Sequence, residues 1–247
     1  MQYCIYAETS GGSFTMGKKT VPLKNLVVLQ GGLGNTEENP FKPLTLFAAT
    51  DGNTLSKAPQ PVPGGLLGVQ APNWWPQLLK DLFNETINNG FTGVTATVEL
   101  AGPASGVKVN LLNAVSGEGA VFVLPVKVKL SNPFLGSNCY IGSNSSPINL
   151  NLTTGSTSPP APNGPITGST GEVVEPAFGM TALKNNRLVD NAFSAPGANG
   201  CGGILFSWAV DPFVNSIVGV PSPAGTNTAI LEGTTYFGNG AILREQL

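Results

Sequence analysis

The chain has 247 residues, a formal net charge of −2 and no histidine, and 11% of its residues are charged against about 25% in an ordinary soluble domain. This slightly negative net charge excludes a nucleic-acid binder that neutralises phosphates with clustered Lys and Arg. The absence of histidine excludes Ser-His-Asp and Cys-His catalysis and the usual zinc sites. No phosphate loop or metal-ligand spacing is found, so neither a cofactor nor a metal is expected.

Alternating apolar and polar residues, the pattern of a strand with one buried face, recur along the chain. In chain order, strands are predicted at residues 3–7, 25–30, 44–48, 94–100, 107–111, 121–124, 126–130, 148–153, 229–232 and 234–237. Pro125 interrupts one pair of them, which indicates an edge position or a bulge there because proline cannot donate to a ladder.

A first helix is predicted between Pro76, which suits a first helical position, and Gly90, which suits the end of a helix. Apolar residues recur three and four positions apart between them and form a single stripe of Leu78, Leu79, Leu82, Phe83 and Ile87. Because each such side chain contributes about 1.5–3 kcal/mol when it is buried, we expect the rest of the fold to cover the stripe.

A second, shorter helix is predicted to begin at Asp211-Pro212, with Asp211 as its N-cap. Its inward side chains are expected to be Phe213, Val214, Ile217 and Val218. The apolar run 204–210 that precedes this helix contains Trp208, and we expect this tryptophan to lie in the core.

Strands outnumber helices, so the predicted fold is mainly β, an antiparallel β-sandwich or barrel with one or two short helices packed against it. Residues 155–171 are rich in Pro, Gly, Ser and Thr and predict a long exposed loop. This loop could divide the chain near residue 160, but we favour a single domain over residues 1–247.

The three cysteines, Cys4, Cys139 and Cys201, allow three single pairings. We expect Cys139 to pair with Cys201, because both lie in turn-rich segments whose small residues let two backbones approach closely. Cys4 would then be free, or its partner would have been lost with an N-terminal segment. The alternative is three unrelated reduced thiols.

No apolar run reaches 18 residues, which excludes a membrane-spanning helix. The first thirty residues also lack the pattern of a secretion signal. Either the protein is made for the cytosol, or this is a mature chain whose export signal has been removed or replaced by Met1. Few charges, many Asn, Thr, Ser and Gly residues and cysteines in loop-like contexts favour the second explanation, a secreted or cell-surface protein.

Two kinds of candidate site stand out. Trp74-Trp75 could form a stacking platform for a sugar ring, although the favoured interpretation is that Trp75 covers the start of the helix and Trp74 covers the sheet. A carboxylate-based glycoside hydrolase needs two acids about 5–10 Å apart, and the candidate pairs are Glu172 with Glu175, Asp190 with Asp211, and Glu37 with Glu38. With 14 acids in the chain, such pairs are expected by chance.

Four segments, 22–32, 135–142 (LGSNCYIG), 148–154 (INLNLTT) and 188–203 (LVDNAFSAPGANGCGG), resemble uncharacterised secreted, cell-surface β-rich proteins of actinobacteria. The resemblance covers most of the chain. It implies export, a β-rich body and a disulfide between Cys139 and Cys201, and it carries no catalytic motif.

The sequence therefore favours a secreted, non-enzymatic structural or surface-interaction protein that self-associates into a homo-oligomer or filament in an extracellular or cell-envelope structure. The reason is the scarcity of charge, since interface centres are depleted in Lys, Glu and Asp. The alternative is an extracellular glycan-binding module that uses Trp74 or Trp75, with cell-wall glycan as its partner. A carboxylate-based hydrolase ranks third.

Overall fold

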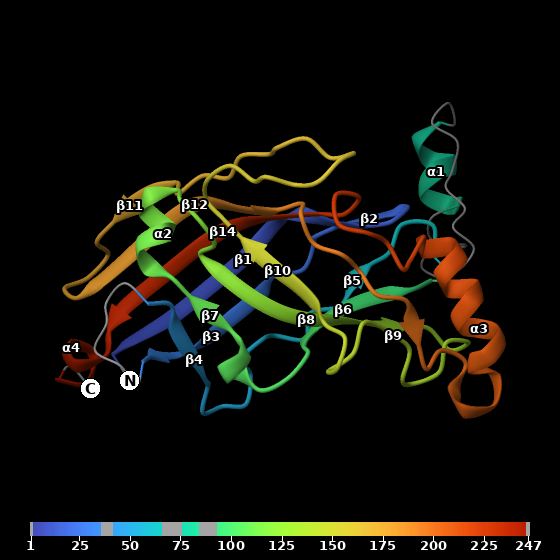
Figure 1. The fold of residues 1–247 in the computed structure, drawn as a ribbon, viewed down its shortest axis with the longest axis horizontal. Helices are drawn as coiled ribbons and strands as arrows, with labels where there is room; N and C mark the ends of the chain where they lie inside the picture. The colour runs from blue at the N-terminus through green and yellow to red at the C-terminus, as the bar shows by residue number, and fades with distance from the viewer. Residues whose placement is uncertain (1, 36–41, 66–75, 84–92, 246–247) are drawn as a thin grey trace.

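The computed structural model describes residues 2–35, 42–65, 76–83 and 93–245. Within them, the chain forms one 14-stranded sheet in which every pairing of strands is antiparallel, so the prediction of a mainly β, antiparallel fold is confirmed (Figure 1). The strands are β1 (Tyr3–Met16), β2 (Lys19–Pro22), β3 (Val27–Gly34), β4 (Leu44–Ala48), β5 (Gln60–Pro61), β6 (Thr95–Leu100), β7 (Lys108–Val109), β8 (Phe122–Ser131), β9 (Tyr140–Ile141), β10 (Ile148–Leu152), β11 (Glu172–Val174), β12 (Met180–Asp190), β13 (Ala198–Asn199) and β14 (Thr228–Asn239).

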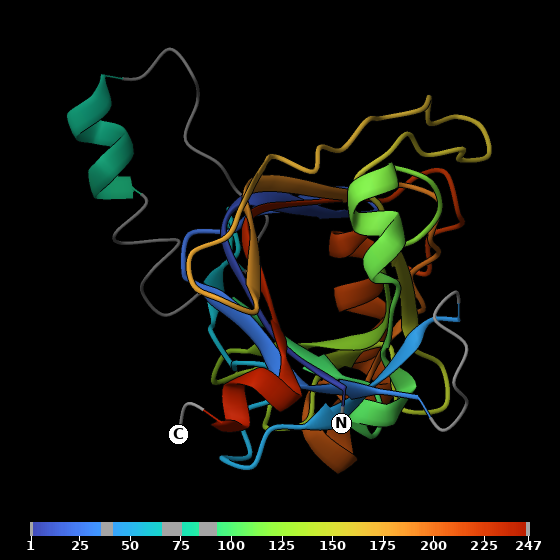
Figure 2. The same cartoon turned by 90° about the vertical axis from the view of Figure 1, so that its left-hand side faces the viewer.

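The strand order is β11-β12-β14-β1-β3-β4-β7-β8-β6-β5, with β10 and β9 also paired to β8, β2 to β1 and β13 to β9. This path does not close into a ring of ladders, but the sheet curls around a common interior (Figure 2). Outside the ladders of this path, Thr153 after β10 forms a single bridge with Val189 of β12. Beside this bridge, the amide of Asn151 donates to the carboxylate of Asp190 over 2.6 Å. These contacts join the first half of the chain to the second.

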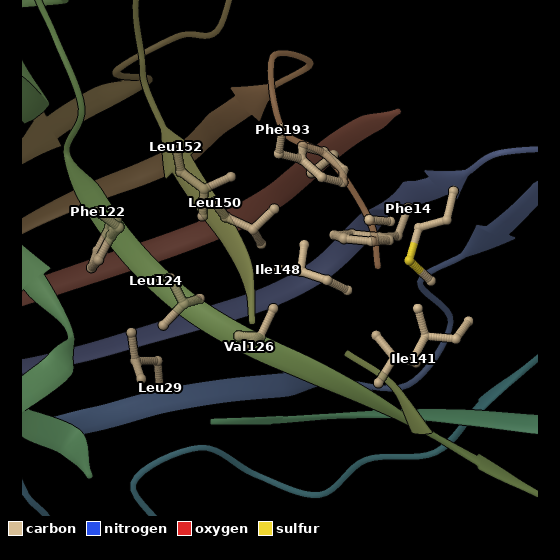
Figure 3. Close-up of a cluster of buried hydrophobic side chains, with 14 of the residues drawn as sticks. Phe14, Leu29, Phe122, Leu124, Val126, Ile141, Ile148, Leu150, Leu152 and Phe193 are labelled. Atoms are coloured by element: carbon tan, nitrogen blue, oxygen red, sulfur yellow. The ribbon is translucent and has the colours of Figure 1, made fainter. Parts of the chain in front are cut away.

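The core lies on the inner face of the sheet, which the alternating strands supply. Inward side chains of β8 and β10 converge there with Phe14 and Phe193, whose ring centres are 5.4 Å apart (Figure 3). Every second residue of β10 is buried, while Asn149 and Asn151 between them face solvent. The buried residues of these two strands are Phe122, Leu124, Val126, Val128, Leu130, Ile148, Leu150 and Leu152.

Pro125 lies inside the continuous strand β8, so the expectation of an edge or a bulge is wrong. Its carbonyl accepts a hydrogen bond from the amide of Ala101 just beyond β6. On that side, β8 changes partner from β7, which pairs up to Val123, to β6, which pairs from Val126. The position where Pro125 lacks a backbone N–H therefore lies between the β7 ladder and the β6 ladder. Neither ladder loses a hydrogen bond because of the proline.

The strand predicted over 107–111 is also shorter than expected. The β7 ladder ends at Val109, and the side chain of Asn110 accepts hydrogen bonds from the amides of Leu112 and Asn113, which makes it the N-cap of a helix. A side-chain acceptor at this position competes with the extended conformation and starts the helix. At the other end of the chain, the two strands predicted at 229–232 and 234–237 form one continuous strand, β14.

The helices differ most from the prediction. They are α1 (Gln77–Phe83), the 3-10 helix η2 (Ala104–Gly106), α2 (Leu111–Ser116), α3 (Gly203–Val218) and α4 (Gly240–Glu245). The start of α1 after Pro76 is as predicted, but Leu78 from its apolar stripe is 80% exposed, so this side chain is not covered. Ile87 and Gly90 lie outside the described residues.

Residues 155–171 form the predicted long loop, which folds back on itself. Ser156 pairs with Thr167 through an isolated bridge. Near the tip of the loop, the side-chain amide of Asn163 donates to the carbonyl of Asn227 over 3.0 Å. The loop therefore follows a defined path although its side chains are mostly polar.

Candidate functional site

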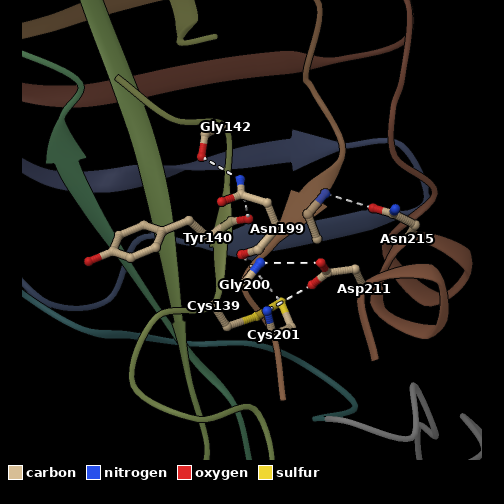
Figure 4. The surroundings of a disulfide bond; sticks show 9 residues. Cys139, Tyr140, Gly142, Asn199, Gly200, Cys201, Asp211 and Asn215 are labelled. Carbon is tan, nitrogen blue, oxygen red and sulfur yellow. Dashed lines mark hydrogen bonds between the residues drawn. A yellow bond between two sulfur atoms is a disulfide. The ribbon is translucent and has the colours of Figure 1, made fainter. Parts of the chain in front are cut away.

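The helix α3 begins at a covalent link to the sheet. Cys201 forms a disulfide with Cys139, which directly precedes β9 (Figure 4). The predicted pairing is thus present, and Cys4 is a free, half-buried thiol on β1. Gly202 then caps the helix with a φ of 78°. A Cβ at Gly202 would lie 2.6 Å from a methyl group of Val210, so both backbone angle and space require glycine at the helix start.

Asp211 secures the same junction from inside the helix. Its carboxylate accepts hydrogen bonds from the amides of Cys201, over 2.7 Å, and Gly200, over 3.2 Å (Figure 4). The helix predicted to begin at Asp211 instead begins eight residues earlier, and Pro212 lies within it. Asp211 does hold backbone amides, as an N-cap would, but those amides belong to the segment before the helix. Asp211 can bind these amides because the fold around the disulfide brings them close to its carboxylate.

The remainder of α3 is held by polar contacts to the sheet. The side-chain oxygen of Asn215 accepts a hydrogen bond from the amide of Ala198 in β13, over 2.7 Å. At the end of the helix, the amide of Lys18 donates to the carbonyl of Val218, and its ammonium lies 3.4 Å from the carbonyl of Ser216. A cation at this position also suits the negative end of the helix dipole. The helix is therefore fixed at its start, its middle and its end.

The outer side of α3 is apolar and exposed. We call the set Ile204, Leu205, Phe206, Trp208 and Phe213 the α3 face; their exposed fractions run from 47% to 99%, and that of Trp208 is 79%. The expectation that Trp208 lies in the core is wrong. Among the predicted inward residues, Val214 is buried, Ile217 and Val218 are half-buried, and Phe213 faces outward.

The inner side of α3 covers a small apolar cavity, the α3 cavity. Val214, Ile217 and Val218 line it from the helix, and Met16, Ala96 and Leu130 line it from the sheet. Lys19 also borders the cavity, and burial lowers the pKa of its ammonium below the usual value. The helix thus rests on the sheet through a few aliphatic contacts.

The candidate carboxylate pairs do not form an acidic cleft in the described structure. Glu172 and Glu175 are exposed, at and just beyond the sheet-end strand β11, and Glu37-Glu38 lies outside the described residues. Asp190 and Asp211 hold different segments: Asp211 binds the start of α3, whereas Asp190 accepts from the amides of Asn151 and Ala192.

Asp190 is a buried carboxyl with a structural task. Its exposed fraction is 2%, and burial raises the pKa of the group above its usual value, while the hydrogen bonds from the amides of Ala192 and Asn151 lower it. Raised acid pKa values also occur in catalytic sites. In Asp190, each carboxylate oxygen accepts a hydrogen bond from a backbone amide. The bond from Asn151 links β10 to β12, and this structural role explains why the carboxyl is buried.

Trp74 and Trp75 lie outside the described residues, so the sugar platform stays a prediction. The part of the chain that the structure describes holds no group of three or more Cys, Asp or Glu side chains suited to a metal ion. Nor does any of its helices have the length and apolarity needed to cross a membrane.

Comparison of the chain with protein-family models, with curated proteins and with solved structures finds no match. The dominant feature of the candidate site is the α3 face, a fixed apolar surface. The signal was present in the sequence, because a helix that is apolar on every side cannot bury all of its residues against one sheet. The same argument places part of the run 204–210 outside the core, in contrast to the prediction for Trp208.

Proposed function

We propose that this is a secreted, non-enzymatic surface-interaction protein that self-associates by packing the α3 face of one copy against the same face of a second copy. The observation that carries the proposal is that three aromatic side chains, Phe206, Trp208 and Phe213, are exposed on one anchored helix. Large aromatic side chains are enriched at the energetic centres of protein interfaces.

The exposed aromatic area on α3 is large. At roughly 150–250 Å² per aromatic side chain, the exposed fractions of Phe206, Trp208 and Phe213 (61%, 79% and 47%) correspond to roughly 280–470 Å². Ile204 and Leu205 add to this area. The total is a large part of the roughly 800 Å² that each partner buries in a standard interface, and it reaches the upper range of apolar patches on monomers.

The electrostatics support pairing between identical copies. The only ionised side chain on α3 is Asp211, and its carboxylate is occupied by backbone amides. Two copies can therefore bring their α3 faces together without desolvating an unpaired charge. A face that meets itself makes an isologous two-fold interface, which is the commonest symmetry of soluble oligomers. Because the helix is fixed before it binds, little ordering entropy opposes the contact.

Secretion is the second part of the proposal, and the disulfide supports it. A bridge between Cys139 and Cys201 is consistent with an oxidising compartment. The test is the intact mass of protein from its natural host after alkylation without reductant. Only Cys4 should be alkylated, and labelling of all three cysteines would argue for a reducing compartment.

Sedimentation velocity over a wide concentration range tests self-association. The wild-type protein should form dimers, whereas Trp208→Ser combined with Phe206→Ser should remain monomeric at the same concentrations. Phe213→Ser and Phe47→Ser form a matched pair, because both phenylalanines are 47% exposed but only Phe213 belongs to the α3 face. Phe213→Ser should weaken dimerisation and Phe47→Ser should leave it unchanged. A wild-type protein that stays monomeric at every concentration would refute the proposal.

A further inference from the structure

The outer face of β8 carries two lysines that lie around one tyrosine. Lys127 and Lys129 alternate with the buried residues of this strand, so both side chains leave the sheet on its outer face. Tyr140 of β9 is paired with Lys129, and the centre of its ring lies 4.9 Å from the ammonium nitrogen of Lys127 and 6.0 Å from that of Lys129. We call these three residues the lysine cluster.

The negative charge next to the lysine cluster is smaller than its positive charge. Glu99 of β6 lies opposite Lys127 in the ladder, and its carboxylate accepts a hydrogen bond from the Tyr140 hydroxyl over 3.4 Å. Burial, and then the charge of Glu99 and this hydrogen bond, raise the pKa of Tyr140, so the tyrosine stays neutral. Two ammonium groups thus stand beside one carboxylate, in a chain whose formal net charge is −2.

Neither lysine is neutralised within the described part of the chain. Lys127 donates to the uncharged side-chain oxygen of Asn144 over 3.0 Å, and no carboxylate of the described residues forms an ion pair with either lysine. The Tyr140 side chain points away from the disulfide and from Asp211, whose carboxylate binds backbone amides (Figure 4). Contact with an aromatic ring attracts a cation but does not cancel its charge. The cluster therefore favours an anion from outside the chain.

An open hollow lies beside Lys129. Its wall is formed by residues of the segment 131–137, which follows the body of β8, and by Gly93 before β6. The hollow holds about 570 Å³ and is wide open to solvent. Lys129 and the exposed Ser131 and Ser137 contribute an ammonium group and two hydroxyls to its lining. The lining is thus polar, in contrast to the α3 cavity.

The wall of the hollow is held in a defined position. The side-chain oxygen of Asn132 accepts a hydrogen bond from the amide of Phe134 over 2.8 Å, and its amide donates to the carbonyl of Gly93 over 2.7 Å. Further along the segment, the carbonyl of Leu135 accepts from the amide of Gly202, the cap of α3, over 2.8 Å. Because these contacts fix the wall before a ligand binds, little ordering entropy opposes binding.

The chemistry of this surface fits a charged oxygen group. Ammonium and hydroxyl groups both donate hydrogen bonds, and a hydrogen bond between an ammonium group and an anion is stronger than one between neutral groups. A carboxylate and a phosphate ester share this acceptor chemistry. Small-molecule pockets enclose most of their ligand, whereas this hollow is open, which suits a substituent on a long polymer.

We propose that the lysine cluster and the hollow beside it bind a carboxylate or phosphate group of an acidic extracellular polysaccharide. Lys129 donates to the anion from the wall of the hollow, Lys127 adds a second positive charge, and the hydroxyls of Ser131 and Ser137 complete the set of donors. The choice of an extracellular polymer rests on the secretion proposed above. The site includes no residue of the α3 face and does not depend on self-association.

Isothermal titration calorimetry tests the site with polymers of known charge. Polygalacturonate carries carboxylates and poly(glycerol phosphate) carries phosphates, so their affinities identify the preferred group, and uncharged dextran is the negative control. The wild-type protein should bind at least one of the two charged polymers and should lose affinity as salt is added. Lys129→Gln should weaken binding about tenfold or more, because a hydrogen bond from a charged donor is lost, and Lys129→Arg should retain it.

A matched variant separates this site from the general charge of the protein. Lys184→Gln on β12 removes the same charge from an exposed strand position opposite Glu172, so it should bind as the wild type does. Lys127→Gln should weaken binding less than Lys129→Gln does, because Lys127 does not line the hollow.

Three results would overturn the proposal. The first is wild-type protein that binds neither charged polymer, or that binds dextran equally well. The second is an equal loss of affinity in Lys129→Gln and Lys184→Gln, because binding would then follow net charge alone. The third is loss of binding in the variant that combines Trp208→Ser with Phe206→Ser, because it would place the polymer on α3. Normal binding by that variant would support a site independent of self-association.

Discussion

The sheet and helix α3 use the same kinds of apolar residue in opposite ways. In β8 and β10 apolar and polar residues alternate, and the apolar ones point inward and hold the fold together. In α3 apolar residues occupy every side of the helix, yet Val214 alone is fully buried while Phe206 and Trp208 face outward. A disulfide and polar contacts hold α3 in place. The helix thus carries more apolar side chains than its packing against the rest of the chain buries.

The largest effect is expected at the covalent junction between these two regions. Replacing Cys139 and Cys201 together by Ser removes a bridge between residues 62 apart, which should lower the free energy of unfolding by about 4 kcal/mol because the unfolded chain regains loop entropy. Urea denaturation measures the change. Cys4→Ser, at the free thiol, should cost less than about 1 kcal/mol. Equal stability of the double variant and the wild type would show that the bridge does not secure α3.

A pair of leucine truncations compares the two regions directly. Leu152→Ala in β10 removes a side chain that is 1% exposed and should cost about 3 kcal/mol of unfolding free energy through lost burial and the cavity left behind. Leu205→Ala on α3 removes one that is 75% exposed and should cost within about 0.5 kcal/mol. The measurement is made at low protein concentration, where the chain is a monomer. A similar cost for both would mean that Leu205 is packed within a single chain.

A smaller effect is expected from the polar anchor of α3. Asp211→Ala leaves the amides of Gly200 and Cys201 without their charged acceptor and should cost about 1.5–3 kcal/mol. Ser216→Ala on the same helix is the control, because the Ser216 side chain is exposed and its backbone carbonyl is retained. If both substitutions cost the same, then Asp211 does not position the helix.

The smallest effect concerns pH and the buried carboxyl in the sheet. The pKa of Asp190 is raised in the folded state above the usual 3.8, so the folded protein binds this proton more tightly than the unfolded chain does. The contribution of Asp190 to stability is therefore greatest below that value, falls as the pH rises towards the folded-state pKa and is constant above it. Asp190→Asn cannot ionise and should lack this decline. Parallel stability curves for wild type and variant from about pH 3 to pH 6 would contradict the assignment.

The strands could be predicted because their signal is local. Alternation alone places β10, β6 and β4 within a residue or two. The signal failed where another group competed with the strand, as Asn110 did by capping α2. The capping pattern at Asp211-Pro212 predicted the wrong start for α3, because the carboxylate of Asp211 binds the amides of Gly200 and Cys201, which the disulfide brings to it.

The candidate sites could be predicted only in part. The apolar run around Trp208 was visible in the sequence, but whether another part of the chain covers it depends on the whole fold.

The pairing of β1 with β14 brings Tyr3 opposite Asn239, and the amide of Gly240 donates to the carbonyl of Gln2. Both ends of the described chain thus lie together, at the pole of the long axis opposite α3 (Figure 1). A fusion partner, a dye or a solid support attached at either end would point away from the helix. Immobilising the protein in this way orients every copy alike, with the exposed apolar side chains of α3 displayed to the medium.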